Sequence, residues 1–424
     1  MSVTTQSLIA DLLKRNYRDV MVDSIYQDTT LFDLIPVFNG DVSGESVRHA
    51  VELTRSHGGG ARSAGEFLPV DNPESFQQST VELKRFYYTL SLDGFVLENF
   101  RKGPGSFVDY LSLRMQNAQR DAANQLNRIC HMDGSGVVAL CDGAQTNVGS
   151  SGSPMTLKHV HGYNFGALQF LEEGDSIAVI DATTSAVKGT ARIDTLDWPN
   201  EQITLKDGKV LTVNDGDKIV FGDSHSNSFN KEAKGLRHLI ANTGTVQGIS
   251  CANFRRWRST IIDKTAAPIP YDWTHITRIV SSTMYKGSSN PQNVVLLMHP
   301  AMLEEHQRLV DPDIRYEATD FKLNKGLEVP TFSVLGKKVA IRDTIHMGYQ
   351  EVVALNTDEL ERLELAPMDF DDRGGEIKAV QGKDAAYAFL KYYFAIAAKT
   401  LNHFARFDGI QVDTEYVQVL QETS

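Results

Sequence analysis

The chain has 424 residues, enough for two or three domains with a substantial core. Its hydrophobic content of 41% and charged content of 23% are ordinary for a globular protein, while its formal net charge of −12 lacks the basic excess that a free nucleic-acid-binding protein needs. No apolar run approaches the roughly 20 residues that cross a bilayer, so the sequence predicts no association with a membrane.

The N-terminal region is predicted to form a helix followed by an arm. Apolar residues recur near helical spacing over residues 5–26, without the apolar stretch of a signal peptide. Residues 27–45 lose this periodicity and are expected to be extended. The three cysteines, Cys130, Cys141 and Cys251, are too few and too scattered for a disulfide framework, which indicates a reducing compartment.

A long β-hairpin is predicted next. Residues 47–53 and 80–92 alternate apolar and polar side chains, and the tip between them contains Gly58-Gly59-Gly60 and Gly65. An isolated two-stranded hairpin is marginally stable in water. We therefore expect so long a hairpin to complete itself on another copy of the chain.

The second arm of this hairpin changes its apolar parity. Val81 and Leu83 share one face, whereas Phe86 and Tyr88 share the other. A shift of one residue moves all following side chains across a sheet. Two interpretations stay open: a β-bulge near Lys84–Arg85, or the end of one strand and the start of a second.

A long helix follows a break at Gly103-Pro104-Gly105. Ser106 is a suitable N-cap, and apolar residues from Phe107 to about Met132 fall at steps of three and four. At 1.5 Å per residue this helix spans roughly 40 Å, long enough for the spine of a domain. Asp133-Gly134-Ser135-Gly136 is expected to end it.

The region from about 165 to 230 changes character. Short apolar runs alternate with turn signals such as Pro199-Asn200 and Asp207-Gly208, which predicts a small barrel or sandwich inserted into the chain. From Gly235 the pattern returns to mixed helices and strands. Residues 385–406, rich in Tyr, Phe and Ala, fit either one long strand or a helix.

Motifs of catalysis are missing from the sequence. It contains no phosphate loop, dinucleotide fingerprint or nucleophile elbow. Cys130, His131 and Cys141 are the residue types of a zinc site at the wrong spacing, and a buried cysteine at a helix end is the favoured interpretation. Acidic residues near 311–313 and 369–372 lie in predicted loops and are expected to face solvent. The residues thus predict no metal, no cofactor and no catalytic group.

One basic and aromatic cluster stands out, Arg255-Arg256-Trp257-Arg258. Such residues could stack on nucleic acid. Four residues are too short to line a groove, however, so we interpret the cluster as a contact between subunits through ion pairs and packing.

The order of these parts resembles the major capsid proteins of tailed bacteriophages, whose Hong Kong 97-type fold is shared with herpesvirus shells. The resemblance covers nearly the whole chain and depends on the succession of parts rather than on any strong motif. These parts are the arm at 1–45, the hairpin with Gly58 to Arg62, the helix ending at 133–136, the restart at 235–237, residues 242–249, residues 336–343 and the closing segment 385–410.

The resemblance implies an α+β fold with a definite division of the chain. The expected parts are an N-terminal arm (1–45), an extended hairpin loop (46–92), a peripheral domain with a spine helix (93–160), a β-rich barrel-like insertion domain (161–232), an axial domain (233–384) and a C-terminal return to the peripheral domain (385–424). The insertion is not part of the minimal fold.

The resemblance also implies a structural role in the virion. Hexamers and pentamers of the chain would assemble in the host cytoplasm into an icosahedral shell around double-stranded DNA, held without sequence-specific contacts. A portal is an implied partner, and a decoration protein is left open. The chain begins without a long charged coiled segment, so a separate scaffolding protein is expected. The stretch from Arg55 to Thr80 contains no lysine, which argues against covalent Lys–Asn cross-linking there.

Residues expected at contacts between subunits lie in the hairpin and in the basic cluster. They are the apolar positions Val47, Val51, Leu53, Leu68 and Val70, the charged positions Arg55 and Arg62, and the cluster residues Arg255, Arg256 and Trp257. Two alternatives remain. One is an α/β enzyme whose site assembles in space from pairs such as Asp369/Asp371 and His299/Glu304, and the other is a different structural protein of the virion or tail.

Overall fold

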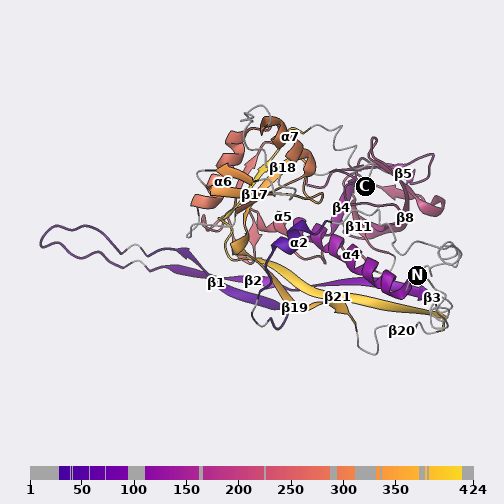
Figure 1. Ribbon diagram of the computed structural model, residues 1–424, viewed down its shortest axis with the longest axis horizontal. Coiled ribbons are helices and arrows are strands. Elements are labelled where there is room, and N and C mark those ends of the chain that lie inside the picture. The colour runs from indigo at the N-terminus through magenta and orange to yellow at the C-terminus, as the bar shows by residue number, and fades with distance from the viewer. Residues whose placement is uncertain are drawn as a thin grey trace, which may run out of the picture.

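A computed structural model describes most of the chain. The described residues are 28–38, 40, 42–56, 58–71, 73–93, 110–161, 166–223, 226–286, 294–310, 331–334, 337–371, 378–379 and 382–412. The predicted helix at 5–26, the break at 103–106 and the acidic residues at 311–313 lie outside them. Figure 1 shows a body with a helix-covered sheet, a separate barrel and a long hairpin that leaves the body.

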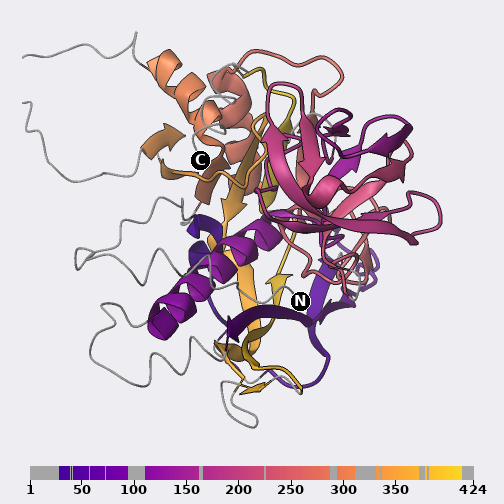
Figure 2. The same ribbon diagram turned by 90° about the vertical axis from the view of Figure 1, so that its right-hand side faces the viewer.

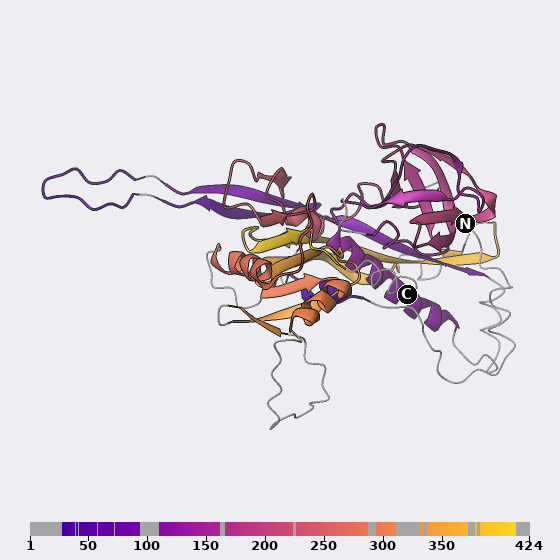
Figure 3. The ribbon, with the colours of Figure 1, turned by 90° about the horizontal axis from the view of Figure 1, so that it is seen from above.

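The hairpin consists of β1 (Ser46–Thr54) and β2 (Ser75–Glu82). The two strands pair antiparallel from Ser46 opposite Glu82 to Thr54 opposite Ser75, with an irregularity between Glu52 and Thr54. Figures 1 and 3 show this ribbon and its tip running straight out of the body. We call residues 55–74, between the two strands, the tip segment, and its outer part lies far from the body of its own chain.

The parity change in the sequence marks a change of sheet. β2 ends at Glu82, and β3 (Lys84–Asp93) begins after the single residue Leu83. β3 pairs along its whole length with β21 (Ala385–Ala398) instead of continuing alongside β1. The interpretation as two strands is confirmed, and the alternative of a β-bulge is wrong.

A long sheet forms around β21. β21 lies between β3 and β19 (Leu360–Phe370), and β20 (Lys378–Ala379) pairs with the first residues of β21. Residues 385–406, which the sequence allowed to be either a strand or a helix, thus form a strand as far as Ala398. β21 has a partner strand on each side. Its alternating apolar residues are buried in this sheet, and the local sequence alone does not show which distant segments bury them.

The predicted spine helix is α4 (Tyr110–His131). At 1.5 Å per residue its 22 residues span about 33 Å. Ala118, Ala122, Leu126 and Ile129, at helical spacing, are all buried. Figure 2 shows α4 lying across the strands of the long sheet, and α4 contacts both β3 and β21.

The segment before the hairpin is not simply extended. It contains the short helix α2 (Thr30–Leu34), and Leu31 and Ile35 are buried in the chain's own core. The amides of Leu31 and Phe32 both donate to Asn127 Oδ1 of α4 at 3.0 Å. The prediction of an extended arm over 27–45 is corrected at this point, because a contact with a helix far along the chain imposes the turn.

A six-stranded mixed sheet forms the second layer of the body. Its order is β14-β22-β18-β15-β17-β16, and α6 packs on β22 and β18 while α5 contacts α4. The bounds are α5 (Leu236–Leu239), β14 (Thr260–Asp263), α6 (Trp273–Tyr285), β15 (Val294–Met298), α7 (Pro300–Val310), β16 (Thr331–Val334), β17 (Lys337–Asp343), β18 (Glu351–Asn356) and β22 (Phe404–Asp408).

The β-rich region closes into a six-stranded barrel in the order β11-β4-β6-β9-β8-β7. Its strands are β4 (Val137–Cys141), β6 (Met155–Lys158), β7 (Ser176–Ile180), β8 (Val187–Asp197), β9 (Gln202–Leu205) and β11 (Lys218–Phe221), with β5 (Gln145–Val148) and β10 (Leu211–Val213) paired alongside. The barrel begins at Val137, before residue 161, where the sequence analysis begins the insertion. β4 and β6 are only five and four residues long, too short to show a clear alternation.

Candidate assembly interface

The described part of the tip segment carries the most exposed apolar side chains of the structure. Phe67, Leu68 and Val70 are 96%, 84% and 86% exposed, and Phe76 in β2 is 57% exposed. Large contiguous apolar surfaces on a soluble protein mark sites of interaction. Leu68 and Val70, which the sequence predicts at a contact between subunits, are thus exposed, and Phe67 beside them is exposed as well, although the sequence prediction left it out.

The first strand of the hairpin behaves differently from the tip. Leu53 is 3% exposed and belongs to the main core of the body, and Val51 packs against the same core. Val47 packs against buried residues of the long sheet. These three side chains were predicted contacts between subunits, but they contact their own chain, because the first strand lies against the body before the ribbon leaves it. We assign them to the root of the hairpin.

A polar anchor fixes the root. The Thr80 amide donates to the Gln247 carbonyl at 2.8 Å, and the buried Ser79 hydroxyl is hydrogen-bonded to the Gln247 side chain at 2.9 Å. With the oxygen and nitrogen of the Gln247 side-chain amide exchanged, the amide oxygen accepts from the Ala398 backbone N at 2.8 Å and the amide nitrogen donates to the Ala398 carbonyl at 2.9 Å. Gln247 thus ties β2 to β21.

The anchor residue lies in a tight turn. Gln247 and Gly248 have φ of 50° and 83°, and they join β12 (Thr245–Val246) to β13 (Ile249–Ser250). Two successive positive φ angles are typical of a two-residue hairpin, and Gly at the second position is the favoured choice. This turn was not predicted, although Gln-Gly between the apolar residues Val246 and Ile249 signals it.

The basic cluster lies beside the root. Arg255 and Arg256 are exposed and line a shallow groove together with Arg55, Leu53 and Phe254. We call this surface the root groove (residues 53–55 and 253–256). In the described part of the chain, no carboxylate lies within ion-pair distance of its three arginines.

Trp257 does not face the groove. It is fully buried, and its indole nitrogen donates to the Val246 carbonyl at 3.1 Å. The prediction that Trp257 contacts another subunit is therefore corrected, since it anchors the loop that presents Arg255 and Arg256. Arg62 is exposed in the tip segment, where its guanidinium donates to the Ala61 carbonyl at 3.0 Å.

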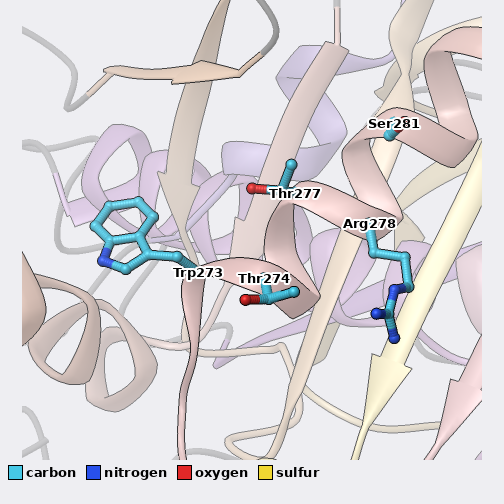
Figure 4. A pocket seen from close by; sticks show the side chains of 5 residues that line it. All are labelled: Trp273, Thr274, Thr277, Arg278 and Ser281. Atoms are coloured by element: carbon cyan, nitrogen blue, oxygen red, sulfur yellow. The ribbon is translucent and has the colours of Figure 1, made fainter.

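A second open surface lies on α6. Trp273, Thr274, Thr277, Arg278 and Ser281 line a shallow depression, and Figure 4 shows Trp273 and Arg278 on opposite sides of the helix. The Trp273 ring meets the His306 ring edge to face at 4.9 Å between centroids. The depression contains hydroxyl groups and one guanidinium but no carboxylate or imidazole lining, so it offers no acid–base pair.

The acidic and histidine pairs of the enzyme alternative do not converge. Asp371 is ion-paired with Lys378 and with Lys391, the latter at 2.7 Å. His299 is buried, which lowers its pKa to about 4, and Glu304 is paired with Arg308 at 2.8 Å on the outside of α7. Asp371, His299 and Glu304 are thus committed to a local structural partner or to the core, and Asp369 is an exposed residue of β19.

The cysteines are buried and unpaired. Cys130, Cys141 and Cys251 are free thiols, and burial raises the pKa of Cys130 and of Cys141 to about 12. A thiol with so high a pKa is a poor nucleophile and a poor metal ligand at neutral pH. Within the described ranges, no group of three His, Cys, Asp or Glu side chains could hold a metal ion, and no helix is long and apolar enough to cross a membrane.

Comparison with solved structures places this architecture among capsid chains. No protein-family model matches the chain, and no curated protein matches it. A chain of the cyanophage A-1(L) capsid asymmetric unit is similar over 96% of this chain and 99% of its own length, with a TM-score of 0.57 and 13% identity. The capsid of a native GTA particle (TM-score 0.49, 10% identity, 96% and 100% covered) and the capsid of the Myoviridae phage XM1 (0.48, 8%, 96% and 99%) are also similar. The chain therefore has the α+β fold of a bacteriophage capsid chain.

Proposed function

We propose that the protein is the major capsid protein of a tailed bacteriophage, with a Hong Kong 97-type fold. Identical chains assemble as hexamers and pentamers into an icosahedral shell that encloses double-stranded DNA. The observation that carries this proposal is the outstretched hairpin, whose tip exposes Phe67, Leu68 and Val70 almost completely. The likeness to a cyanophage capsid chain over nearly the full length supports it.

The energetics favour association through the tip. Burying one large apolar side chain is worth about 1.5–3 kcal/mol, so the three tip residues offer several kcal/mol per subunit. A contact between two different surfaces of identical chains is heterologous, and it closes into a ring when the rotation between neighbours is right. A standard interface buries roughly 1,600 Å², more than one tip supplies, so we expect further contacts along the subunit edges.

The parts of the chain receive their roles within this proposal. The long sheet with α4 forms the peripheral domain, with the segment from 385 returning to it, and the six-stranded sheet forms the axial domain around ring centres. The inserted domain is the barrel from Val137 to Phe221, because its six strands form a closed sheet of their own. The shell protein has no catalytic role. A separate scaffolding protein and a portal are its proposed partners, a decoration protein on the barrel stays open, and assembly takes place in the host cytoplasm.

A hairpin truncation tests the function. Thr54 pairs with Ser75, so replacing residues 55–74 by Asn-Gly joins β1 and β2 through a two-residue turn and keeps every paired residue of the two strands. We expect a folded subunit that forms no closed particles. Full-size shells from this variant, counted by electron microscopy beside the unmodified protein, would show that the hairpin tip is not needed for assembly.

A further inference from the structure

The chain enters and leaves the inserted barrel at one place. It enters at the end of α4 and returns from the barrel to α5, and the two connections lie side by side, since the Asn230 amide donates to the Ser135 carbonyl at 2.8 Å. We call these connections, residues 132–136 and 226–235, the hinge.

The barrel has a hydrophobic core of its own. In the described part of the chain, its main cluster of buried residues lies between Val138 and Ile219, and Met132 in the hinge is the single residue from outside the barrel that joins it. Two units with separate cores are expected to move relative to each other unless a large apolar interface joins them. A rotation about the hinge would therefore leave the barrel core intact.

A small contact outside the hinge holds the barrel against the body. The Gln169 side chain donates to the carbonyls of Ile345 and Met347, at 2.6 and 2.8 Å. The Phe170 ring stacks on the His346 ring, with 6.3 Å between centroids and 15° between planes. We call this contact, between Gln169 and Phe170 of the barrel and the loop after β17, the latch.

The latch covers His346, which is buried among other cationic or potentially cationic groups. The His131 ring of α4 lies 6.3 Å from it between centroids, and Arg128 of α4 and His299 before α7 are also close enough to interact with it electrostatically. The barrel contributes the uncharged Phe170 ring at this point. Burial and Arg128 together lower the pKa of His346 to about 4.

Asp28 is the carboxylate that faces His346, and it compensates only in part. Its Oδ2 lies 3.7 Å from His346 Nδ1. The same carboxylate already accepts from the Thr344 hydroxyl and from the amides of Ile345 and Thr30. A proton on His346 therefore gains little from Asp28 while the latch is closed.

The histidines at the rim of the contact between barrel and body have carboxylates of their own. His159 Nε2 lies 3.3 Å from Glu201 Oε1, and His161 Nε2 lies 3.6 Å from Asp133 Oδ2. Other charged or titratable groups at this rim are Arg237, its ion-pair partner Glu351, and Tyr349. His346, beneath the latch, is thus the histidine whose charged form the closed contact opposes most directly.

We propose that protonation of His346 opens the latch and lets the folded barrel turn about the hinge. Once the Phe170 ring has left, the imidazole reaches water and takes up its proton near pH 6.5. Because the pKa in the latched form is depressed, the latch is at full strength above pH 6.5 and weakens as pH falls towards 4. The ratio of open to latched subunits should rise up to about tenfold per pH unit, about 100-fold between pH 6.5 and 4.5. This device belongs to the single subunit and does not depend on the proposed shell function.

Energy transfer between two fluorescent labels tests the opening. Val187→Cys in β8 of the barrel and Tyr285→Cys at the end of α6 provide exposed labelling positions, while the native cysteines are buried. On labelled subunits at high dilution, we expect the transfer efficiency to change between pH 6.5 and 4.5, with an unaltered far-ultraviolet circular dichroism spectrum.

Two substitutions in the labelled protein test the two sides of the latch. His346→Gln keeps a hydrogen-bonding group beside Asn127 but takes up no proton, so the ratio of open to latched subunits should change less than about threefold over the same range. Gln169→Ala removes two hydrogen bonds, which weakens the latch about tenfold or more and should move the transition about one pH unit higher.

Matched controls lie outside the latch. His306→Gln replaces a buried histidine of α7 and should keep the full pH dependence. Asn200→Ala changes an exposed turn of the barrel and should leave the transition where it is in the unmodified protein.

The opposite results would overturn the inference. Constant energy transfer down to pH 4.5 in both the unmodified protein and Q169A would show that the barrel does not open. A transition that H346Q retains in full would remove His346 from the device. Loss of the circular dichroism signal in step with the change in energy transfer would show unfolding instead of rotation. Since diluted subunits are measured, failure of the protein to form shells would contradict the proposed function but not this inference.

Discussion

Asp28 and Thr344 are 316 positions apart in the sequence, yet the Thr344 hydroxyl donates to the Asp28 carboxylate at 2.5 Å. The Ile345 amide donates to the same carboxylate oxygen at 2.9 Å, and the Asp28 amide donates to Asn124 of α4. Asp28 is 3% exposed. This buried junction joins the segment before the hairpin, the spine helix and the loop after β17.

Asp28→Ala should destabilise the subunit strongly. It removes the carboxylate that accepts from the Thr344 hydroxyl and from the Ile345 amide inside the core, and buried hydrogen bonds to charged groups are worth about 1.5–3 kcal/mol each. We expect a loss of about 3 kcal/mol or more in the free energy of unfolding, measured with urea on unassembled subunits. Asp33→Ala, at an exposed position of α2, is the matched control and should cost below about 1 kcal/mol. Equal effects of the two substitutions would show that the junction contributes little.

Histidines around the junction predict a loss of stability in acid. Burial lowers the pKa of His131 to about 3 and the pKa of His299 and His346 to about 4, whereas the unfolded chain takes up these protons near pH 6.5. Because the folded pKa values are depressed, the stability is fully present above pH 6.5 and is lost as pH falls from there towards 4. Asp175 and Asp408, whose pKa burial raises to about 6, oppose part of this trend.

Replacing one of these histidines measures its contribution to the pH dependence of folding stability. His346→Gln removes one proton that only the unfolded state binds, so the slope of stability against pH should fall by up to about 1.4 kcal/mol per pH unit between pH 6 and 4.5. Urea midpoints over this range, compared with the unmodified protein, give the slope. An unchanged slope would mean that His346 is protonated in the folded subunit as readily as in the unfolded chain.

Gln247→Ala should loosen the root of the hairpin. It removes the side chain that pairs with Ser79 and with the backbone of Ala398, leaving buried polar groups unsatisfied at a cost of about 1–3 kcal/mol. Amide hydrogen exchange in β2 should become about tenfold faster or more, with little change in α4. Gln78→Ala, on the exposed side of the same strand, should leave exchange unaltered. Equal protection of β2 in both variants would assign the anchoring to the apolar contacts of Leu53 instead.

Gly235→Ala should disrupt the join between the barrel and the body. A Cβ at Gly235 would lie 2.3 Å from the Cys130 carbonyl oxygen and 2.5 Å from that of Ile129, both backbone atoms at the end of α4. Neither atom moves cheaply, so we expect a loss of about 2 kcal/mol or more in stability. Gly152→Ala, with open space around the new methyl group, provides the control in the same thermal unfolding experiment. A melting temperature equal to that of the control would show that α4 can shift at this point.

The features that sequence predicted are those that local patterns encode. The hairpin, α4 and the barrel all have apolar periodicity or turn residues within a short window. The parity change at Leu83 was visible too, but its cause was not, because the choice between a bulge and a new strand depends on β21, some 300 residues further along the chain.

The features that sequence reasoning missed depend on distant contacts. The burial of Leu31 and Ile35 follows from Asn127, and that of Leu53 and Trp257 follows from a core assembled from many segments. The root groove exists only because residues 53–55 and 253–256 meet in space. Trp257 was predicted as a contact because a tryptophan beside arginines suggests a surface, whereas its indole nitrogen finds a backbone acceptor inside the core.

Electron microscopy of the purified protein, beside the variant with residues 55–74 replaced by Asn-Gly, shows whether the chain assembles and whether it does so through its hairpin. We expect rings of five and six subunits or closed shells for the unmodified protein, and dispersed single subunits for the variant. Single compact subunits from both proteins at the same high concentration would contradict it.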